Sequence, residues 1–234
     1  MCFSASASFI AGSALTIAGV ASVSQLKKPS HLLFSCIPLF FGIQQFCEGF
    51  LWLSLSDSGF GEWQTTAKYT FLIFAQVIWP FAIPLAFLLI EPLPERRRIM
   101  RFFLFGGIFT SLLLTYRLLF YMAYARIDGC HIEYDIATDE TIQIVTGFLY
   151  LSAIVIAPFL SSWKFSRLLA SVNLVSLILT QLFFRVYFVS VWCFFAAVQS
   201  VIIVLIMREI KRDTLKRRAQ APDEIASGVE PAGI

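Results

Sequence analysis

Glu48 and Arg117 are two ionisable residues that lie inside long apolar stretches of the sequence. Gln44 and Trp52 lie four residues before and after Glu48, and Gln45 lies three residues before it. Side chains at these spacings share one face of a helix. An ionisable residue within a membrane span is costly and is by default a candidate for a functional site. We therefore expect a polar ligand pocket here, with an ion pair between Glu48 and Arg117 as one arrangement.

The same residues also allow structural interpretations. Amides, ion pairs and small residues commonly hold membrane helices together, so Glu48 and its neighbouring glutamines could simply stabilise a bundle. Arg117 lies near the end of its apolar stretch and could extend its charge to the membrane surface. The residue types alone do not decide between a pocket and a structural contact.

The stretches that carry these residues are long enough to cross a membrane as helices. The chain of 234 residues is 58% hydrophobic and 14% charged, whereas soluble domains are about 45–50% apolar and about 25% charged. A span needs about 20 apolar residues, and the runs lack the alternation of a β-barrel. The predicted fold is therefore all-α, a polytopic membrane bundle of seven transmembrane helices. The spans are predicted at residues 6–24, 31–55, 69–90, 102–124, 141–163, 168–184 and 186–207.

Two features within these spans predict local breaks. From residue 168 to residue 207 only Arg185 interrupts the apolar run. One helix of that length would be about 60 Å long, roughly twice the thickness of the hydrocarbon core, so we predict two spans with a tight turn near Arg185. In the third span, Pro80 and Pro84 should kink or loosen the helix and free backbone carbonyls.

Lysine and arginine residues predict the orientation. With seven spans, four basic clusters fall on one side, at residues 27–28, 96–101, 164–167 and 208–218, and an acidic segment at residues 128–140 falls on the other. Because cytoplasmic loops are enriched in Lys and Arg, we predict an N-terminus outside and a C-terminus in the cytoplasm, in a plasma (inner) membrane. Residues 1–207 then form the transmembrane domain. Residues 208–234 form a basic cytoplasmic tail, which begins as a helical extension that would contact anionic lipids and has a disordered end from residue 221.

Further polar residues are predicted to lie at about the depth of Glu48, in the outer half of the membrane. Gln143 and Gln181 lie near the outer ends of their spans, and Gln76, Asn173 and Gln199 lie near the middle. The first residues of the chain should enter at the same outer level. The predicted ligand-binding set is Gln44, Gln45, Glu48, Trp52, Arg117, Cys2 and Ser4.

Cys130 and His131 have side chains that can ligate a metal, and they lie in the predicted outer loop. Close-spaced ligands without a second pair are weak evidence for a site, so we assign no metal, and no cofactor can be named. A disulfide between Cys2 and Cys130 is an alternative, since both would face an oxidising space.

The sequence lacks the residues that several well-known activities require. The seventh span has no lysine for a retinal Schiff base, and the two histidines do not provide a bis-histidine haem site inside the bilayer. The sequence contains no H-E-x-x-H, P-loop or G-x-S-x-G motif, and nothing in it indicates nucleic-acid binding.

The opening residues Met-Cys-Phe-Ser-Ala and the second-span residues Gln44 to Gly49, Gln-Gln-Phe-Cys-Glu-Gly, resemble an uncharacterised family of bacterial integral membrane proteins. Its members begin with Met-Cys-Phe-Ser-Ala and carry a Gln-Gln-x-x-Glu-Gly element. The resemblance implies a bacterial membrane protein and draws attention to Cys2, Ser4 and Glu48, but it implies no activity.

Three functions fit these residues. The first is binding or transport of a small or amphiphilic ligand through the outer-half pocket. The alternative is an intramembrane enzyme acting on a lipid or quinone, with Cys2 or a metal held by Cys130, His131 and acidic residues of the same loop. The third is a proton-coupled transporter, in which Glu48 carries the proton because low dielectric favours a neutral carboxyl group. The expected partners are membrane lipids and a small-molecule or lipid ligand.

Overall fold

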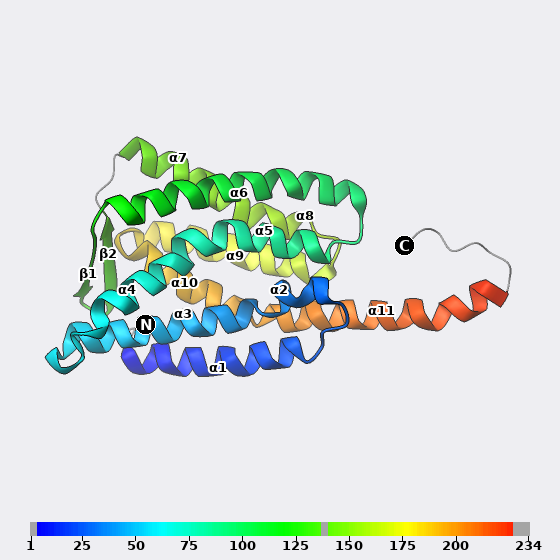
Figure 1. The fold of residues 1–234 in the computed structure, drawn as a ribbon, viewed down its shortest axis with the longest axis horizontal. Coiled ribbons are helices and arrows are strands. Elements are labelled where there is room, and N and C mark those ends of the chain that lie inside the picture. The colour runs from blue at the N-terminus through cyan, green and yellow to red at the C-terminus, as the bar shows by residue number, and fades with distance from the viewer. Residues whose placement is uncertain (1–3, 137–139, 227–234) are drawn as a thin grey trace.

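The computed structural model describes residues 4–136 and 140–226. In these residues the chain forms a bundle of long helices with a small β-hairpin at one end (Figure 1). Seven helical stretches are long and apolar enough to cross a membrane. They agree with the seven predicted spans to within a few residues at most ends, so the predicted helical membrane fold is confirmed.

The first span is the single helix α1 (Ala5–Val23). The second span contains α2 (Leu32–Ser35) and α3 (Ile37–Ser56), preceded by a short turn of 3-10 helix at Pro29–His31. The third contains α4 (Trp63–Leu72), a π-helical segment (Ile73–Ile78) and α5 (Trp79–Ile90), and the fourth is α6 (Pro94–Phe120). A 3-10 turn at Ser58–Phe60 joins the second and third spans.

The remaining spans have two more interruptions. The fifth consists of α7 (Glu140–Leu151), a π-helical segment (Ser152–Ile156) and α8 (Ala157–Leu160). The sixth is α9 (Lys164–Phe183), and the seventh contains α10 (Phe188–Gln199) and α11 (Ile202–Ala226). The turn between α9 and α10 is a 3-10 segment at Arg185–Tyr187, where the tight turn was predicted.

The surface of the bundle is apolar where it would face lipid. On α6, for example, Phe102, Phe105, Leu112 and Leu119 are exposed. In water these side chains would be unfavourably hydrated, whereas hydrocarbon tails solvate them without cost. The chain is therefore a multi-pass membrane protein.

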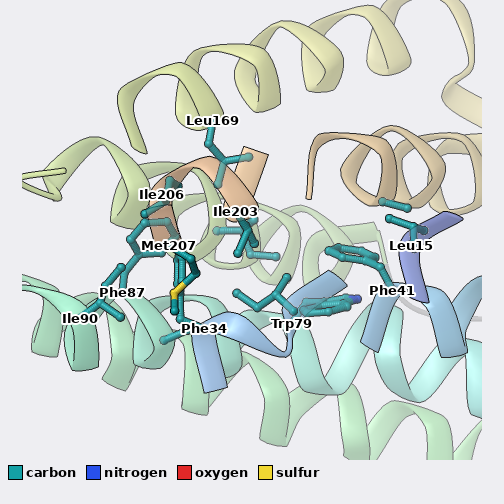
Figure 2. Packing of buried hydrophobic residues seen from close by; sticks show 14 of the residues in the cluster. Leu15, Phe34, Phe41, Trp79, Phe87, Ile90, Leu169, Ile203, Ile206 and Met207 are labelled. Carbon is teal, nitrogen blue, oxygen red and sulfur yellow. The ribbon is translucent and has the colours of Figure 1, made fainter. Parts of the chain in front are cut away.

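Aromatic side chains from the second and third spans form the centre of the bundle (Figure 2). Phe41 stacks on Trp79 with ring centroids 4.0 Å apart, and Phe34 meets Phe87 edge to face at 5.0 Å. Met207 of α11 is fully buried in the same cluster. The seventh span therefore packs against the second and third although it is distant in sequence.

Prolines follow both π-helical segments. Pro80 and Pro158 lack the N–H that a helix needs and leave carbonyls upstream without a donor. Near Pro80, other helices supply hydroxyl donors: Tyr150 Oη donates to the Ala75 carbonyl at 2.6 Å, and Ser111 Oγ donates to the Val77 carbonyl at 2.7 Å. The loosening predicted from Pro80 thus takes the form of a π-helical segment held by neighbouring helices.

A β-hairpin follows α6 and was not predicted. The helix ends at Phe120 rather than residue 124, and β1 (Ala123–Asp128) pairs antiparallel with β2 (His131–Ile136). The two-residue loop begins with Gly129 at φ 57°, a left-handed conformation that suits glycine at the first loop position. The residues alternate, so that one face of the hairpin packs on the bundle and the other is exposed.

Polar contacts hold the hairpin to the helices. Lys68 Nζ donates to the Ala123 carbonyl at 2.6 Å, and Arg117 Nη2 donates to the Ile136 carbonyl at 2.8 Å. Ala123 and Ile136 are paired across the strands, so cationic side chains from α4 and α6 hold both sides of the hairpin base. We call this end of the bundle the hairpin end.

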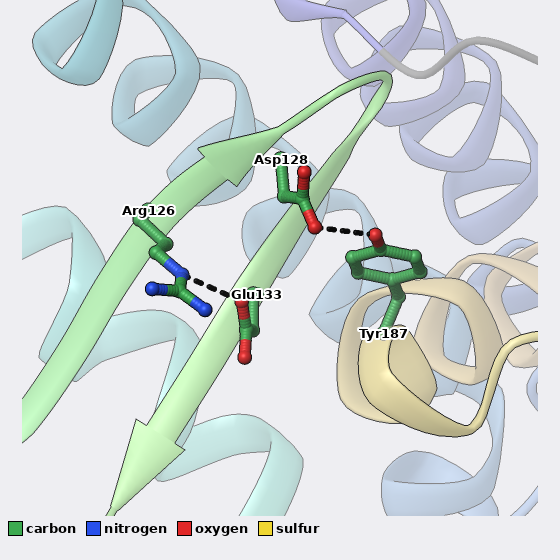
Figure 3. Close-up of polar contacts among 4 residues, drawn as sticks. All are labelled: Arg126, Asp128, Glu133 and Tyr187. Carbon is green, nitrogen blue, oxygen red and sulfur yellow. Dashed lines mark hydrogen bonds and ion pairs between the residues drawn. The ribbon is translucent and has the colours of Figure 1, made fainter.

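The tip of the hairpin is fastened as well (Figure 3). Tyr187 Oη donates to Asp128 Oδ2 at 2.6 Å, and Arg126 Nε pairs with Glu133 Oε2 across the exposed face at 2.6 Å. The hairpin is therefore a fixed cover over one end of the bundle. The opposite end, from which α11 extends (Figure 1), carries the four basic clusters and is called the basic end.

The C-terminal segment follows its prediction in part. Helix α11 continues without a break past Met207 to Ala226, so the predicted basic helical extension is present. Residues 221–226, which were predicted to be disordered, belong to this helix, and residues 227–234 lie outside the described part of the chain.

Candidate functional site

Glu48 lies at the centre of a buried polar group that we call the Glu48 cluster: Gln44, Gln45, Glu48 and Trp52 of α3 with Ser190 of α10. Glu48 is only 3% exposed, and both glutamines are fully buried. Gln45 Nε2 donates to Glu48 Oε2 at 3.3 Å, and Ser190 Oγ donates to Glu48 Oε1 at 2.5 Å. The four α3 residues share the face that their spacing predicts.

Trp79 of α5 connects the cluster to the centre of the bundle. Its Nε1 donates to Gln44 Oε1 at 2.8 Å, while its ring stacks on Phe41. The cluster therefore joins the second, third and seventh spans through α3, α5 and α10. This contact supports the structural interpretation of Gln44, which holds two helices together.

Other polar atoms in and beside the cluster have no hydrogen-bond partner among residues 4–136 and 140–226. They include Gln45 Oε1, Trp52 Nε1 and the hydroxyl of Tyr134 on β2. An unsatisfied buried polar atom costs about 1–3 kcal/mol. The unpaired atoms mark the neighbourhood of Glu48 as a place where a proton, a water molecule or a small polar group would be stabilised.

The expected ion pair between Glu48 and Arg117 is not formed among the described residues. The Arg117 guanidinium donates to the Ile136 carbonyl and lies in the field of Asp135 instead. The prediction of an ion pair is wrong because the hairpin, which supplies both the Ile136 carbonyl and Asp135, was not expected. Within the part of the chain that the structure describes, the Glu48 carboxyl group meets neutral hydrogen-bond donors only.

A cavity of about 640 Å³ lies beneath the hairpin, and we call it the hairpin cavity. Helices α6, α7, α9 and α10, the third span and β2 contribute to its wall. Its polar lining residues are Gln76, Arg117, Tyr134, Gln143, Thr146, Tyr150, Gln181 and Arg185. Among the described lining residues there is no Asp or Glu, and most of the others are apolar or aromatic. The cavity is therefore amphipathic, with its fixed charges positive.

The predicted grouping of polar residues by depth is met in part. Gln76, Arg117, Gln143 and Gln181 line one cavity. Asn173 and Gln199 lie elsewhere, beside a smaller apolar cavity of about 50 Å³. There Gln199 Nε2 donates to Ser176 Oγ at 2.8 Å, a contact that joins α10 to α9 as interhelical glue.

The Glu48 cluster does not line the hairpin cavity but lies directly behind its wall. Tyr134 and Cys193 line the cavity, and both feel the charge of Glu48. Burial raises the pKa of Tyr134 well above its usual value, and Glu48 adds to this effect, so the hydroxyl stays protonated at neutral pH. Tyr134 therefore separates the two polar regions with a hydroxyl group that can donate a hydrogen bond.

Two members of the predicted ligand-binding set belong to the N-terminus. Ser4 is exposed, and its Oγ accepts the Ala7 N–H at 3.2 Å, which caps α1. Cys2 lies outside the described residues, so its role and its disulfide with Cys130 stay predictions. The capping contact gives Ser4 a structural role.

The hairpin tip carries Cys130 and His131, the residues of the alternative metal site. Among the described residues no three His, Cys, Asp or Glu side chains are grouped in a way that could hold a metal ion. The His131 ring stacks on Tyr187 with centroids 4.6 Å apart, and burial lowers the pKa of His131. Its ring packs as a neutral aromatic side chain.

Three residues of this region were missed at the level of sequence. Ser190 gives no signal, because a lone serine in an apolar run is commonplace. Tyr134 belongs to the alternating pattern of β2, which could have indicated its inward direction. Arg185 was assigned to a turn, which is correct, but its position beside Gln181 places it at the hairpin cavity.

The fold and the two polar regions define the class as a seven-span helical membrane protein with a buried carboxyl group and an amphipathic cavity next to the hairpin. The model of a family of unknown function (DUF6629) matches residues 1–220. The chain belongs to this family. No curated protein and no solved structure matches the chain.

Proposed function

We propose that the protein binds an anionic amphiphile in the hairpin cavity. The observation that carries this proposal is the lining itself, in which Arg117 and Arg185 are the charged residues among apolar and aromatic neighbours. A carrier and a sensor would share this binding step. This proposal agrees with the predicted function of ligand binding or transport. The proposed site, however, is the hairpin cavity rather than the neighbouring face of α3 that carries Glu48.

The two arginines favour a carboxylate or a phosphate as the head group. A guanidinium presents several N–H donors in a planar fork that matches the oxygens of either anion. Within the described part of the chain, Arg117 donates to Ile136 through Nη2, and its buried Nε has no partner there. Arg117 is therefore held in place by the hairpin while it keeps donors for a ligand.

The remaining wall favours an apolar chain. Phe148, Leu151, Phe188 and Trp192 lie on α7 and α10 around the cavity. Its volume falls within the range of about 300–1,000 Å³ that small-molecule sites usually have. An amphiphile would place its head group near Arg117 and Arg185 and its chain against these side chains.

Native mass spectrometry of the detergent-purified protein tests the proposal with three probes of similar chain length. Oleate carries a carboxylate, oleoyl lysophosphatidate a phosphate, and monoolein no charge. We expect at least one anionic probe to bind more tightly than monoolein, and the preferred anion identifies the head group. Arg117→Gln and Arg185→Gln should each weaken anion binding roughly tenfold, the value of one charge-assisted hydrogen bond.

Arg97→Gln is the matched control, because Arg97 is exposed at the basic end, far from the cavity along the bundle. It should bind the anionic probes as the unmodified protein does. Equal binding of monoolein and both anions, or equal losses in all three variants, would contradict a charge-selective site.

The orientation of the protein is part of the proposal. With the basic end in the cytoplasm of a plasma membrane, the hairpin cavity faces the outer half of the bilayer. We expect a phosphatase reporter to be active when fused before residue 4 or inserted at Gly129, and a cytoplasmic fluorescent reporter to be active when fused after residue 226. Activity of the same reporter at both chain ends would contradict an odd number of spans.

A further inference from the structure

We propose that Glu48 takes up a proton when the hairpin cavity binds its anion, so that anion binding is coupled to protonation across the Tyr134 wall. This inference rests on the proposed function, since it concerns the same cavity. It assigns a role to the one carboxyl group that is buried in the middle of the described bundle.

The first support is the surroundings of the carboxyl group. A buried carboxylate is costly unless a positive group pairs with it. Ser190 and Gln45 donate to Glu48, and both are neutral. A proton is the smallest occupant that would remove the charge, and the donors can remain in place because a carboxylic acid still accepts hydrogen bonds.

The second support comes from the elements packed around α3. Helix α1 contains no ionisable residue. Lys68 of α4 and Arg117 of α6 each donate to a carbonyl of the hairpin base. On β1, Arg126 and Asp128 lie on the outward face, and the acidic residues Asp57 and Glu62 at the adjoining turn are exposed. None of these described charges is placed to neutralise Glu48.

The titratable groups that do face Glu48 are weak acids. They are Tyr134 from β2 and Cys193 from α10, each of which interacts electrostatically with Glu48. At neutral pH a buried phenol and a buried thiol are uncharged. Glu48 is therefore the group whose charge can change when the electrostatic potential in the cavity changes.

The third support is the shared wall. Tyr134 and Cys193 belong both to the lining of the cavity and to the surroundings of Glu48. An anion in the cavity would then be separated from Glu48 by one layer of side chains. Repulsion between two negative charges at such a separation changes an equilibrium by on the order of tenfold, and protonation of Glu48 removes it.

The sign of the coupling follows directly. The proton moves from water to the Glu48 carboxylate, and no other bond changes. Anion affinity should be high while Glu48 is protonated and should fall as rising pH removes the proton. By linkage, the bound anion must favour the protonated form by the same factor.

Isothermal titration with a long-chain alkyl sulfonate tests this inference, because the sulfonate keeps its charge from about pH 5 to about pH 8. We expect its affinity for the unmodified protein to fall on the order of tenfold across this range. The affinity of Glu48→Gln, which keeps the shape but not the charge, should stay high and constant. His131→Asn is the control, because His131 is another titratable residue at the hairpin end. This variant should retain the pH dependence of the unmodified protein.

Proton uptake gives a second readout that does not depend on the folding of Glu48→Gln. Titrations in buffers of different ionisation enthalpy should show protons taken up on sulfonate binding by the unmodified protein and by His131→Asn. Binding without uptake, or a pH dependence that survives in Glu48→Gln, would overturn the coupling and leave the binding proposal intact. No binding of the sulfonate, oleate or lysophosphatidate at any pH would overturn both.

Discussion

Replacing Gly107 with alanine should destabilise the protein by about 3 kcal/mol, the upper part of the range for overpacked sites. A Cβ atom at Gly107 would lie 2.0 Å from the carbonyl oxygen of Pro80 and 2.8 Å from its carbonyl carbon. Both atoms belong to the backbone of α5 and cannot rotate away. Helices α5 and α6 would have to separate, which would also strain the bond from Ser111 Oγ to the Val77 carbonyl.

Gly106→Ala is the matched control for this substitution. The two glycines are neighbours in α6, but a Cβ atom at Gly106 would meet nothing within 4 Å. Alanine there should be neutral or slightly stabilising, because alanine favours helix over glycine by up to about 1 kcal/mol. Thermal unfolding in detergent, followed by the fraction that remains monodisperse, measures both variants. Equal midpoints for the two would show that α5 and α6 are not packed backbone to backbone.

The helical spans could be predicted because lipid imposes a strong and simple condition. Each span must satisfy its own backbone and present about 20 apolar residues, so length and hydropathy are sufficient. The shared face of Gln44, Glu48 and Trp52 follows from helical periodicity in the same way. The turn at Arg185 could be placed because a helix twice as long as the membrane is thick has no stable position.

The hairpin has sequence signals that are independent of span length and hydropathy. Residues 123–128 and 131–136 alternate between inward apolar and outward polar side chains, and Gly129 lies at the loop. These are ordinary hairpin signals, but the first strand follows an apolar helix so closely that it was counted as its last turn. The charges of Asp128 and Glu133 made the rest resemble an acidic loop.

The partners of Glu48 and Arg117 depend on contacts that no local pattern encodes. Ser190 is 142 positions from Glu48 in sequence, and the Ile136 carbonyl that binds Arg117 belongs to the hairpin. Depth alone suggested an ion pair, since both residues lie towards the same end of the bundle. The fold shows that residues at one depth can face different spaces, with Glu48 behind the cavity wall and Arg117 inside the cavity.

Replacing Glu91 with alanine should also destabilise the protein by about 3 kcal/mol. Glu91 follows α5 at the basic end and is only 3% exposed. Its carboxylate accepts the Ser162 N–H at 2.8 Å, the Leu93 N–H at 3.2 Å and the Ser162 hydroxyl. One side chain thus ties the turn before α6 to the turn before α9. Its removal leaves two partly buried backbone N–H groups without their acceptor, and a donor left without its bond costs about 1–3 kcal/mol.

Glu95→Ala tests whether burial and contacts, rather than charge, make the difference. Glu95 lies in the first turn of α6 and is exposed, so its loss should cost no more than the few tenths of a kcal/mol to about 1 kcal/mol that a helix-dipole interaction contributes. Glu91→Gln should fall between the two, because its amide oxygen can accept one of the backbone bonds but its nitrogen cannot. Limited proteolysis should cut Glu91→Ala faster at residues 91–93 and 161–163 if the turns have come apart. Identical melting and cleavage of Glu91→Ala and Glu95→Ala would mean that other contacts hold the two turns together. Two such contacts are present: Trp163 Nε1 donates to the Ile90 carbonyl at 3.0 Å, and Arg96 Nη1 donates to the Leu160 carbonyl at 3.1 Å.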